Sequence, residues 1–282
     1  MIQRKHKDKL FNYIFGNEER KDYLLSLYNA LNDKDYTDPA DLTITTIEDI
    51  IYLGYKNDVS CIVATDEILS LYEHQSTFNP NMPIRGVFYF AKLYEKFITI
   101  NKLNVYGTAQ IKLPTPQYYV FYVGKGDFPE RMELKLTDMF AEQTDILECK
   151  AIMLNINAGY NQKLIEKCKP LRDYSYFIDC IYQNKKICDT IETAIDKAVN
   201  QCIEENVLGD ILLTHKAEVK DMLFTEFNEE EYIEMVKKES LSEGIEIGKK
   251  ELIQELINEG KITLEEGAKM LGIAKEELEK QK

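Results

Sequence analysis

The sequence predicts an α/β fold in which helices flank a mixed sheet and a helical C-terminal region follows. Three observations lead to this fold class. Strand-like runs rich in β-branched and apolar residues recur between residues 42 and 157. Apolar residues at helical spacing precede these runs and separate two of them. After Gly159 the pattern is helical. A strand, helix, strand succession requires a crossover, so some strands should pair in parallel.

The first elements follow from spacing and turn formers. Residues 8–31 are predicted to form one helix or two, because apolar residues recur there at helical intervals. Gly16 and Asn17 interrupt the run, and Asn17 can cap its second half. Residues 32–41 are rich in turn formers and predict a loop. Residues 42–51 alternate and are β-branched, which predicts a strand.

Residues 55–85 are the stretch that the remaining elements surround. They are predicted to form two strands joined by a tight acidic turn at residues 65–67. A loop at 78–83 should lead into a helix over 84–101, since Pro83 suits a first helical turn. Residues 113–117 predict a break, and 118–124 predict a strand covered on both faces. After a turn and a short acidic segment, 146–157 predict another buried strand.

The part after Gly159 predicts a series of helices. Four helical segments follow one another, in NQKLIEKCKPL, YSYFIDCIYQ, ICDTIETAIDKAVNQCI and GDILLTHKAEVKDMLF. The highly charged residues 227–260 predict one long helix or two pieces hinged near Ser242-Glu243-Gly244. Thr263 and Glu266 then form a capping box, and a helix that breaks at Gly272 precedes a second short one. This ending has a helix–turn–helix-like pattern.

Length and composition limit the classes of protein that this chain can be. With 282 residues, of which 44% are hydrophobic, one large domain with a smaller appendage is expected. No signal peptide or membrane-spanning run is visible, so a cytoplasmic location is expected. The six cysteines form no CxxC pair and are expected to be reduced thiols. The three histidines do not cluster, which argues against a zinc site.

The charge distribution limits the partners. A net charge of −14 argues against general affinity for nucleic acid, whose phosphates need Lys and Arg. Much of the acid lies in the last fifty-odd residues, so the front of the chain is closer to neutral. A local basic groove in the front part of the chain is compatible with the net charge, because affinity for nucleic acid depends on how the charges are distributed.

The candidate site lies on the two strands of residues 55–85. Because strand side chains alternate, Glu73 and Gln75 should point to one face and His74 to the other. Pairing of the strands around the turn at residues 65–67 would bring Asp58 close to Glu73. Two carboxylates and an amide form a hard-oxygen site of the kind that Mg²⁺ prefers. His74 is interpreted as a packed or hydrogen-bonded residue.

Several strings resemble one family. The runs IEDIIYLGYKNDVSCIV and LSLYEHQSTFNPNMPIR are similar to the Rpn family of recombination-promoting nucleases and transposases, within the PD-(D/E)XK superfamily. The resemblance extends over residues 8–230, through DKLFNYIFGNEERKDYLLSLYNALN, LPTPQYYVFYVG, LKLTDMF, MLNIN and KAEVKDMLFTEF. It implies a restriction-endonuclease-like core and a Mg²⁺-dependent DNA endonuclease of mobile-element, recombination or defence contexts. Mn²⁺ is expected to substitute for Mg²⁺.

The resemblance also implies roles for individual residues. Asp58 matches the first motif carboxylate and Glu73 the second, and both would bind the metal. Gln75 occupies the place where many nucleases of the superfamily have lysine, and can only orient water by hydrogen bonds. A Glu on the first helix often completes such sites, so Glu19 is the candidate and Glu18 the alternative.

Basic and polar residues near the site are candidates for DNA contacts. Arg85 follows the second strand and has the geometry to hold a phosphate bidentately. Lys92 and Lys96 either extend this basic patch or solvate a helix face. Lys56 and Asn57 either contact phosphate or form a solvated edge. The aromatic residues Tyr72 and Phe78 are interpreted as core rather than as base-stacking groups.

The predicted domains are a nuclease-like core at 1–160, a helical extension at 161–227 and a charged helical tail at 228–282. The tail either reads DNA or associates with a second copy or a partner. Its last helix, AKEELEKQK, has no arginine, whereas Ile245, Leu252 and Leu256 need burial, which favours a homo-oligomer through these helices. Three functions remain open: a metal-dependent endonuclease, a non-catalytic nuclease-fold protein that binds DNA or a partner, and an assembly protein.

Overall fold

A computed structural model describes residues 9–46, 58–63 and 67–272 of the chain. The chain forms two compact units, Met1–Glu226 and Phe227–Lys282, and each is treated by itself below. The first unit contains the sheet and the candidate site. The second contains most of the charged C-terminal helix.

The elements alternate as the sequence predicts, with one additional strand. In chain order they are α1 (Lys9–Phe15), η1 (Glu18–Arg20), α2 (Lys21–Asn32), η2 (Pro39–Asp41), β1 (Leu42–Ile44), β2 (Val59–Val63), β3 (Ile68–Gln75), α3 (Met82–Ile100), β4 (Thr115–Tyr122), β5 (Arg131–Lys135), η3 (Leu136–Met139), β6 (Lys150–Asn155), α4 (Gln162–Lys167), α5 (Lys169–Lys185), α6 (Ile191–Glu204), α7 (Gly209–Thr214), α8 (Lys216–Asn258) and α9 (Leu264–Leu271).

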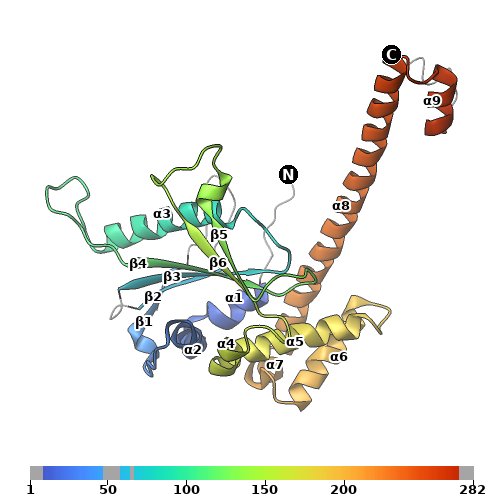
Figure 1. Cartoon of the computed structure of the whole chain (residues 1–282). Coiled ribbons are helices and arrows are strands. Elements are labelled where there is room, and N and C mark those ends of the chain that lie inside the picture. Colours follow the sequence, from blue (N-terminus) through green and yellow to red (C-terminus); the bar gives the residue numbers. More distant parts are fainter. Residues whose placement is uncertain (1–8, 47–57, 64–66, 273–282) are drawn as a thin grey trace. The chain divides into compact units, whose positions relative to one another are not determined.

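The six described strands form one mixed sheet in the order β1-β2-β3-β4-β6-β5. The pairs β1–β2, β2–β3 and β5–β6 are antiparallel, whereas β3–β4 and β4–β6 are parallel. The connection from β3 through α3 to β4 is the predicted crossover, so the expectation of a mixed sheet with helices on its faces is confirmed. Figure 1 shows α3 on one face of the sheet and α1, α2 and α5 on the other.

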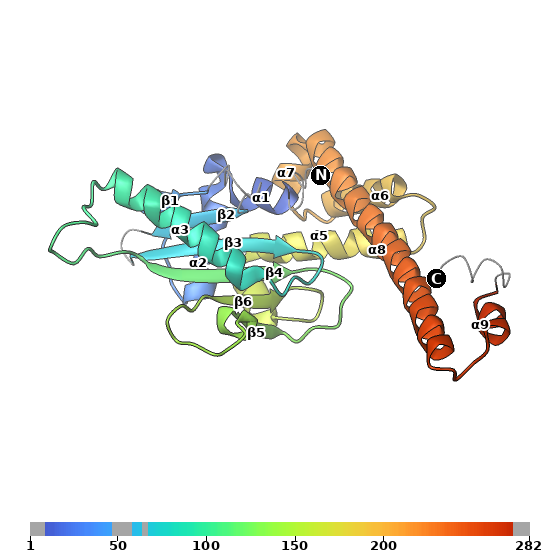
Figure 2. The same cartoon turned by 90° about the horizontal axis from the view of Figure 1, so that it is seen from above.

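Both faces of the central strands are therefore covered. In β3 every residue from Leu69 to His74 is buried, a continuous pattern that is typical of a strand packed on both sides. On one face Phe121 of β4 lies against Phe11 of α1, with ring centroids 5.5 Å apart. On the opposite face α3 runs across the strands, as Figure 2 shows from above.

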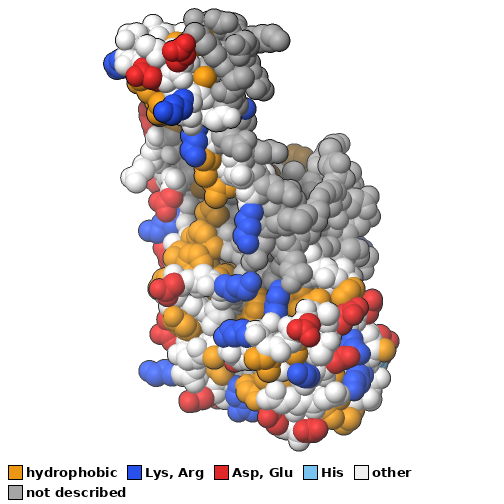
Figure 3. All heavy atoms as spheres, turned by 90° about the vertical axis from the view of Figure 1, so that its right-hand side faces the viewer, with side chains coloured by type: hydrophobic (Ala, Val, Ile, Leu, Met, Phe, Trp, Pro, Cys, Tyr) orange, Lys and Arg blue, Asp and Glu red, His pale blue; other side chains and the backbone are white. Residues whose placement is uncertain are grey.

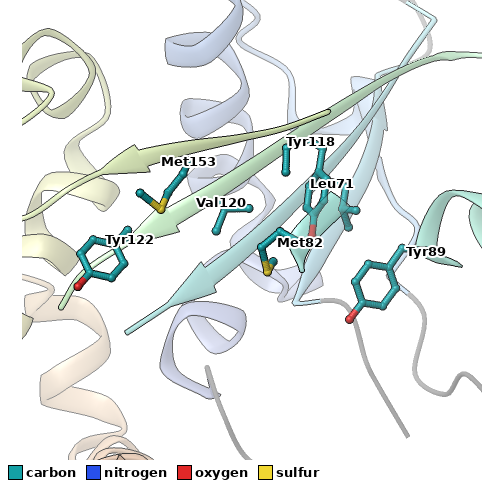
Figure 4. Close-up of a cluster of buried hydrophobic side chains, with 8 residues drawn as sticks. Leu71, Met82, Tyr89, Tyr118, Val120, Tyr122 and Met153 are labelled. Atoms are coloured by element: carbon teal, nitrogen blue, oxygen red, sulfur yellow. The ribbon is translucent and has the colours of Figure 1, made fainter. Parts of the chain in front are cut away.

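The core under α3 joins the sheet to the helix that follows the candidate site. Figure 4 shows residues from β3, β4, β6 and α3 that pack together in this cluster. Its members are Leu71, Met82, Tyr89, Tyr118, Val120, Tyr122, Ala151 and Met153. Phe78 stacks on Phe128 at its edge, and Tyr72 is fully buried, which confirms the interpretation of both aromatics as core.

Two strand predictions need correction. The predicted break at 113–117 is wrong after Pro114, because β4 begins at Thr115 and Pro116 lies within it, opposite Leu69. A proline is tolerated there because β6 pairs with β4 only from Tyr119 onward, so the missing N–H removes no ladder bond on that side. The strand predicted at 146–157 is only Lys150–Asn155, since Ile146 is 91% exposed.

Strand β5 was not predicted from the sequence, and the observed ends of several other elements differ from the predicted ends. In β5, Met132 and Leu134 alternate with charged residues and pack on the core cluster, the pattern of an edge strand. The strand predicted at 42–51 ends at Ile44 among the described residues, and residues 47–51 lie outside them. Helix α3 begins at Met82, two residues before its predicted start, with Pro83 in its first turn.

The helical half contains a series of helices, as predicted, but with different boundaries: Cys168 divides NQKLIEKCKPL between α4 and α5, and His215 divides GDILLTHKAEVKDMLF between α7 and α8. It also decides between the two forms of the charged stretch. Helix α8 is continuous through Ser242 and Gly244, so the alternative of two hinged pieces is wrong. The capping box between Thr263 and Glu266 opens α9, and Gly272 ends it with a positive φ of 67°. The short helix expected after Gly272 lies outside the described residues. Among the helices that the structure describes, none is long and apolar enough to cross a membrane.

Helix α3 can approach the sheet closely because Gly86 has no side chain. A Cβ at this position would lie 2.7 Å from Cε1 of Tyr118 and 2.9 Å from Sγ of Cys149. Both neighbours belong to the packed interior, so neither can move without disturbing the core.

We predict that Gly86→Ala lowers the free energy of unfolding by about 1–3 kcal/mol, because overpacking outweighs the gain in helix propensity. Gly244→Ala is the matched control, since nothing lies within 4 Å of that position in α8. It should be neutral or stabilising by about 1 kcal/mol. Urea denaturation measures both, and equal effects of the two substitutions would contradict the close approach of α3.

Candidate functional site

The pairing of β2 with β3 places Asp58 beside the segment that carries Glu73. Val59 pairs with Tyr72, so the residue before Val59 comes next to the residue after Tyr72. Oδ2 of Asp58 accepts a hydrogen bond from the backbone N–H of His74 at 2.7 Å. The strand register is therefore the one that pairing around residues 65–67 predicts. Asp58 itself directly precedes β2 and is 9% exposed.

Glu73 is fully buried on the face of the sheet that α3 covers. Its Oε2 lies 2.7 Å from Nη2 of Arg85, which comes from the first turn of α3. The Glu73 side chain is inaccessible to solvent, whereas 19% of the Arg85 side chain is accessible. Nη2 of Arg85 also donates to the hydroxyl of Tyr89 at 3.1 Å, one helical turn further along. The result is a buried acidic side chain with a counter-charge held by a helix.

The charges at this site act on one another strongly. Burial lowers the pKa of the Arg85 guanidinium, but the negative charge of Glu73 and the hydroxyls of Tyr89 and Tyr118 together outweigh burial, so the pKa is raised overall. Burial raises the pKa of the Tyr89 hydroxyl, and the negative charges of Glu73 and Asp58 raise it further. Both carboxylates thus raise the pKa of the same hydroxyl, Glu73 more than Asp58.

Gln75 ends β3 and is partly exposed, in contrast to the buried residues before it. Its carbonyl accepts a hydrogen bond from the N–H of Val123 at 3.0 Å, which ties the strand end to β4. By strand alternation its side chain shares the face of Glu73. This amide therefore lies at the more accessible end of the candidate site.

His74 points to the opposite face and packs between aromatic rings. Its ring stacks on Phe11 with centroids 5.8 Å apart and meets the edge of Tyr174 at 5.5 Å. The interpretation of His74 as a packed residue is confirmed. Its backbone N–H donates to Asp58.

The remaining predicted site residues are dispersed. Glu19 is exposed in η1, where its N–H bonds to Oδ1 of Asn17, and Glu18 forms an ion pair with Lys21. On the exposed side of α3, Nζ of Lys92 lies 2.7 Å from Glu95. Lys56 and Asn57 lie outside the described residues. Arg85, expected from the sequence to contact phosphate, is instead bound to Glu73.

The donor set fits a hard divalent cation in kind. Asp58 and Glu73 offer carboxylate oxygens and Gln75 an amide oxygen, the ligands that Mg²⁺ prefers. A carboxylate has about four lone-pair positions, so one hydrogen bond to the His74 N–H does not exhaust Asp58. In the described part of the chain, no three His, Cys, Asp or Glu side chains gather as a metal-binding group, so Glu19 does not join Asp58 and Glu73.

The role of Tyr89 was not predicted from the sequence. Arg85 and Tyr89 are four residues apart, a spacing at which side chains meet on one helical face. That spacing is visible in the sequence, but Tyr89 has the appearance of an ordinary core position of an amphipathic helix. The acidic partner of Arg85 lies on a strand, and only the fold reveals it.

We predict that Asp58→Ala destabilises the protein by about 1–3 kcal/mol, because it leaves the buried N–H of His74 without this acceptor. Asp58→Asn retains an oxygen that can accept the bond and should cost less than about 1 kcal/mol. Urea denaturation of the two variants measures the difference. Equal stability of Asp58→Ala and the unsubstituted protein would show that the hydrogen bond from the His74 N–H to Asp58 does not contribute to stability.

Comparison with known proteins adds no assignment. No protein family, curated protein or solved structure matches the chain. The resemblance to recombination-promoting nucleases therefore stays a prediction from the sequence, and the roles of the site residues depend on their chemistry and positions.

Proposed function

We propose that this protein is a metal-dependent deoxyribonuclease that hydrolyses phosphodiester bonds. The observation that supports this proposal is the convergence of Asp58 and Glu73 from two neighbouring strands, with the amide of Gln75 on the same face. In the proposal the sheet is a restriction-endonuclease-like core, the substrate is DNA, and the reaction serves recombination, mobile elements or defence in the cytoplasm.

Each residue of the site has a defined task in this proposal. Asp58 and Glu73 would hold Mg²⁺, or Mn²⁺ in its place, through their carboxylate oxygens. When bound, the cation lowers the pKa of a water and neutralises phosphate charge. Gln75 orients a water molecule by hydrogen bonds, because an amide cannot supply the positive charge of a lysine. Lys92 is proposed as a phosphate contact and Glu19 as an auxiliary acid outside the Asp58–Glu73 pair, whereas Arg85 is held by Glu73.

A second candidate is a nuclease-fold protein that binds DNA or a partner without cutting. The observation that favours it is the ion pair between Glu73 and Arg85, which already neutralises one of the two carboxylates. The amide at position 75 and the net charge of −14 are in keeping with this candidate. The two candidates differ in one measurable property, namely cleavage that depends on metal and on Asp58.

We predict that the protein nicks supercoiled plasmid in Mg²⁺ or Mn²⁺, and that Asp58→Asn lowers the rate about 100-fold or more, because a metal ligand is lost. Asn is chosen because it preserves the acceptor for the His74 N–H. Gel electrophoresis of the plasmid over time provides the rate. Cleavage by Asp58→Asn at the rate of the unsubstituted protein would show that this site does not carry out the cleavage.

Glu19→Ala tests the most distant of the proposed residues in the same assay. An exposed Glu whose N–H bonds locally to Asn17 affects cleavage only if its carboxylate serves the site. A rate equal to that of the unsubstituted protein would remove Glu19 from the proposal and leave Asp58, Glu73 and Gln75.

The C-terminal unit is proposed to associate with a second copy of the chain. Leu241, Ile245 and Leu252 lie on one face of α8 at intervals of four and seven residues, and each is about half exposed or more. Figure 3 shows hydrophobic side chains along the described length of this helix between charged ones. Because apolar residues at such intervals pack between identical helices as a coiled coil, a homo-oligomer is the proposed assembly.

Within the unit, Ile253 and Ile257 of α8 face α9. A Cβ at Gly267 of α9 would meet Cδ1 of Ile257 at 2.6 Å and Cγ2 of Ile253 at 3.0 Å, so α9 packs closely on this side. The face of Leu241, Ile245 and Leu252 is a different one and stays accessible.

We predict that Leu241→Glu combined with Leu252→Glu shifts the protein from oligomer to monomer, because each substitution places a charge in the apolar seam. Light scattering after size exclusion measures the mass. Ser242→Glu is the control, since it adds the same charge on a neighbouring face of α8. An unchanged mass of the double variant would count against assembly through this face.

A further inference from the structure

The carboxylate that is proposed to bind metal already holds a cation. Oε2 of Glu73 lies 2.7 Å from Nη2 of Arg85. A bound Mg²⁺ requires direct oxygen ligands at about 2.0–2.1 Å. A guanidinium that stayed in place would then lie beside a divalent charge in a poorly screened interior, where repulsion is strong. The two cations would therefore compete for the single negative charge of Glu73.

We infer that Arg85 is the counter-ion of the metal-free site, and that a divalent cation binds Glu73 only by displacing the Arg85 guanidinium. This inference rests on the proposed metal-binding role of Asp58 and Glu73. In this inference Arg85 determines how tightly the site binds metal without being a metal ligand itself.

The surroundings of the pair suit such an exchange. Glu73 is fully buried and needs a positive charge in every state, because an uncompensated buried carboxylate is strongly disfavoured. Of the two partners only Arg85 is reached by solvent, so its guanidinium can turn toward water while Glu73 stays fixed in the strand. The hydroxyl of Tyr89 and the sulfur of Met82, at 3.1 and 3.5 Å, hold Arg85 in its inward position.

Competition for one carboxylate has a quantitative consequence. The free energy that binds Arg85 to Glu73 is lost when metal enters, so the apparent affinity for metal is lower than the affinity of the same ligands without Arg85. Removing the positive charge at position 85 should therefore tighten metal binding, whereas removing a residue that only supports the fold would weaken it or leave it unchanged.

The first test is the binding of Mn²⁺ alone, measured by isothermal titration calorimetry. Arg85→Gln should bind Mn²⁺ about tenfold more tightly than the unsubstituted protein, a typical size for coupling between two ligands. Arg85→Lys retains the charge and should bind like the unsubstituted protein. Lys150→Gln is the matched control, because it removes a lysine that pairs with Glu133 on the exposed surface, 3.4 Å away. Unchanged or weaker binding by folded Arg85→Gln would overturn the inference.

The second test titrates the unsubstituted protein. It therefore shows whether Arg85 leaves Glu73 even if Arg85→Gln does not fold. Protein labelled with ¹⁵N-arginine is titrated with Mg²⁺, and the Arg85 side-chain signal is assigned by its absence from Arg85→Lys. The signal should shift as the site fills, because the guanidinium leaves Glu73. A signal that stays unchanged while Mg²⁺ saturates an Asp58-dependent site would overturn the inference.

The outcomes separate this inference from the proposed function. Tighter Mn²⁺ binding by Arg85→Gln without plasmid cleavage supports the exchange and excludes the nuclease. Plasmid cleavage that requires Asp58, with Mn²⁺ affinity unaffected by Arg85→Gln, supports the nuclease and excludes the exchange. If neither protein binds Mn²⁺ and Asp58→Asn has no effect on any measurement, both are wrong.

Discussion

The buried ion pair between Glu73 and Arg85 is the interaction on which the rest of the site depends. A carboxylate with no solvent access is tolerated only beside a positive charge, and removal of one partner of such a pair costs about 3–5 kcal/mol. The pair joins the central strand of the sheet to the first turn of α3. The helix that carries Arg85 covers the sheet face that carries the candidate site (Figure 1).

The neighbouring positions show how the chain permits this arrangement. Pro83 sits in the first turn of α3 and so helps to set its start. Gly86, one residue after Arg85, lets the helix lie close to Tyr118 and Cys149. Tyr89 then faces the guanidinium from the next turn. One short segment, residues 82–89, thus supplies the counter-ion, its hydrogen-bond partner and the close helix–sheet contact.

Most of the element order could be predicted from the sequence, because apolar periodicity and turn formers report directly on local structure. The crossover through α3 and the capping box at Thr263 are examples. The edge strand β5 was missed because its alternation is short and three of its five residues are charged. The break predicted at 113–117 failed because proline usually ends a strand, and only the pairing limits of β6 show why Pro116 can lie inside one.

The site could be predicted only in part, for a similar reason. Strand alternation and the position of the turn are local, so Asp58, Glu73 and Gln75 could be grouped from the sequence. The partner of Arg85 could not, because the twelve-residue separation between Glu73 and Arg85 spans a strand end, a loop and a helix start. Arg85, which the sequence suggests as a surface phosphate contact, is in the fold the counter-charge of the buried Glu73.

The sheet order has a consequence for how the protein is made. The strand that carries Glu73 is central, and the rings around His74 on its far side come from both Phe11 and Tyr174. A growing chain therefore cannot complete the packing on this face of β3 until α5 has left the ribosome, after the residues of the candidate site have been synthesised. Premature termination before α5 would therefore yield fragments in which Asp58 and Glu73 are present but the face of β3 that carries His74 lacks Tyr174.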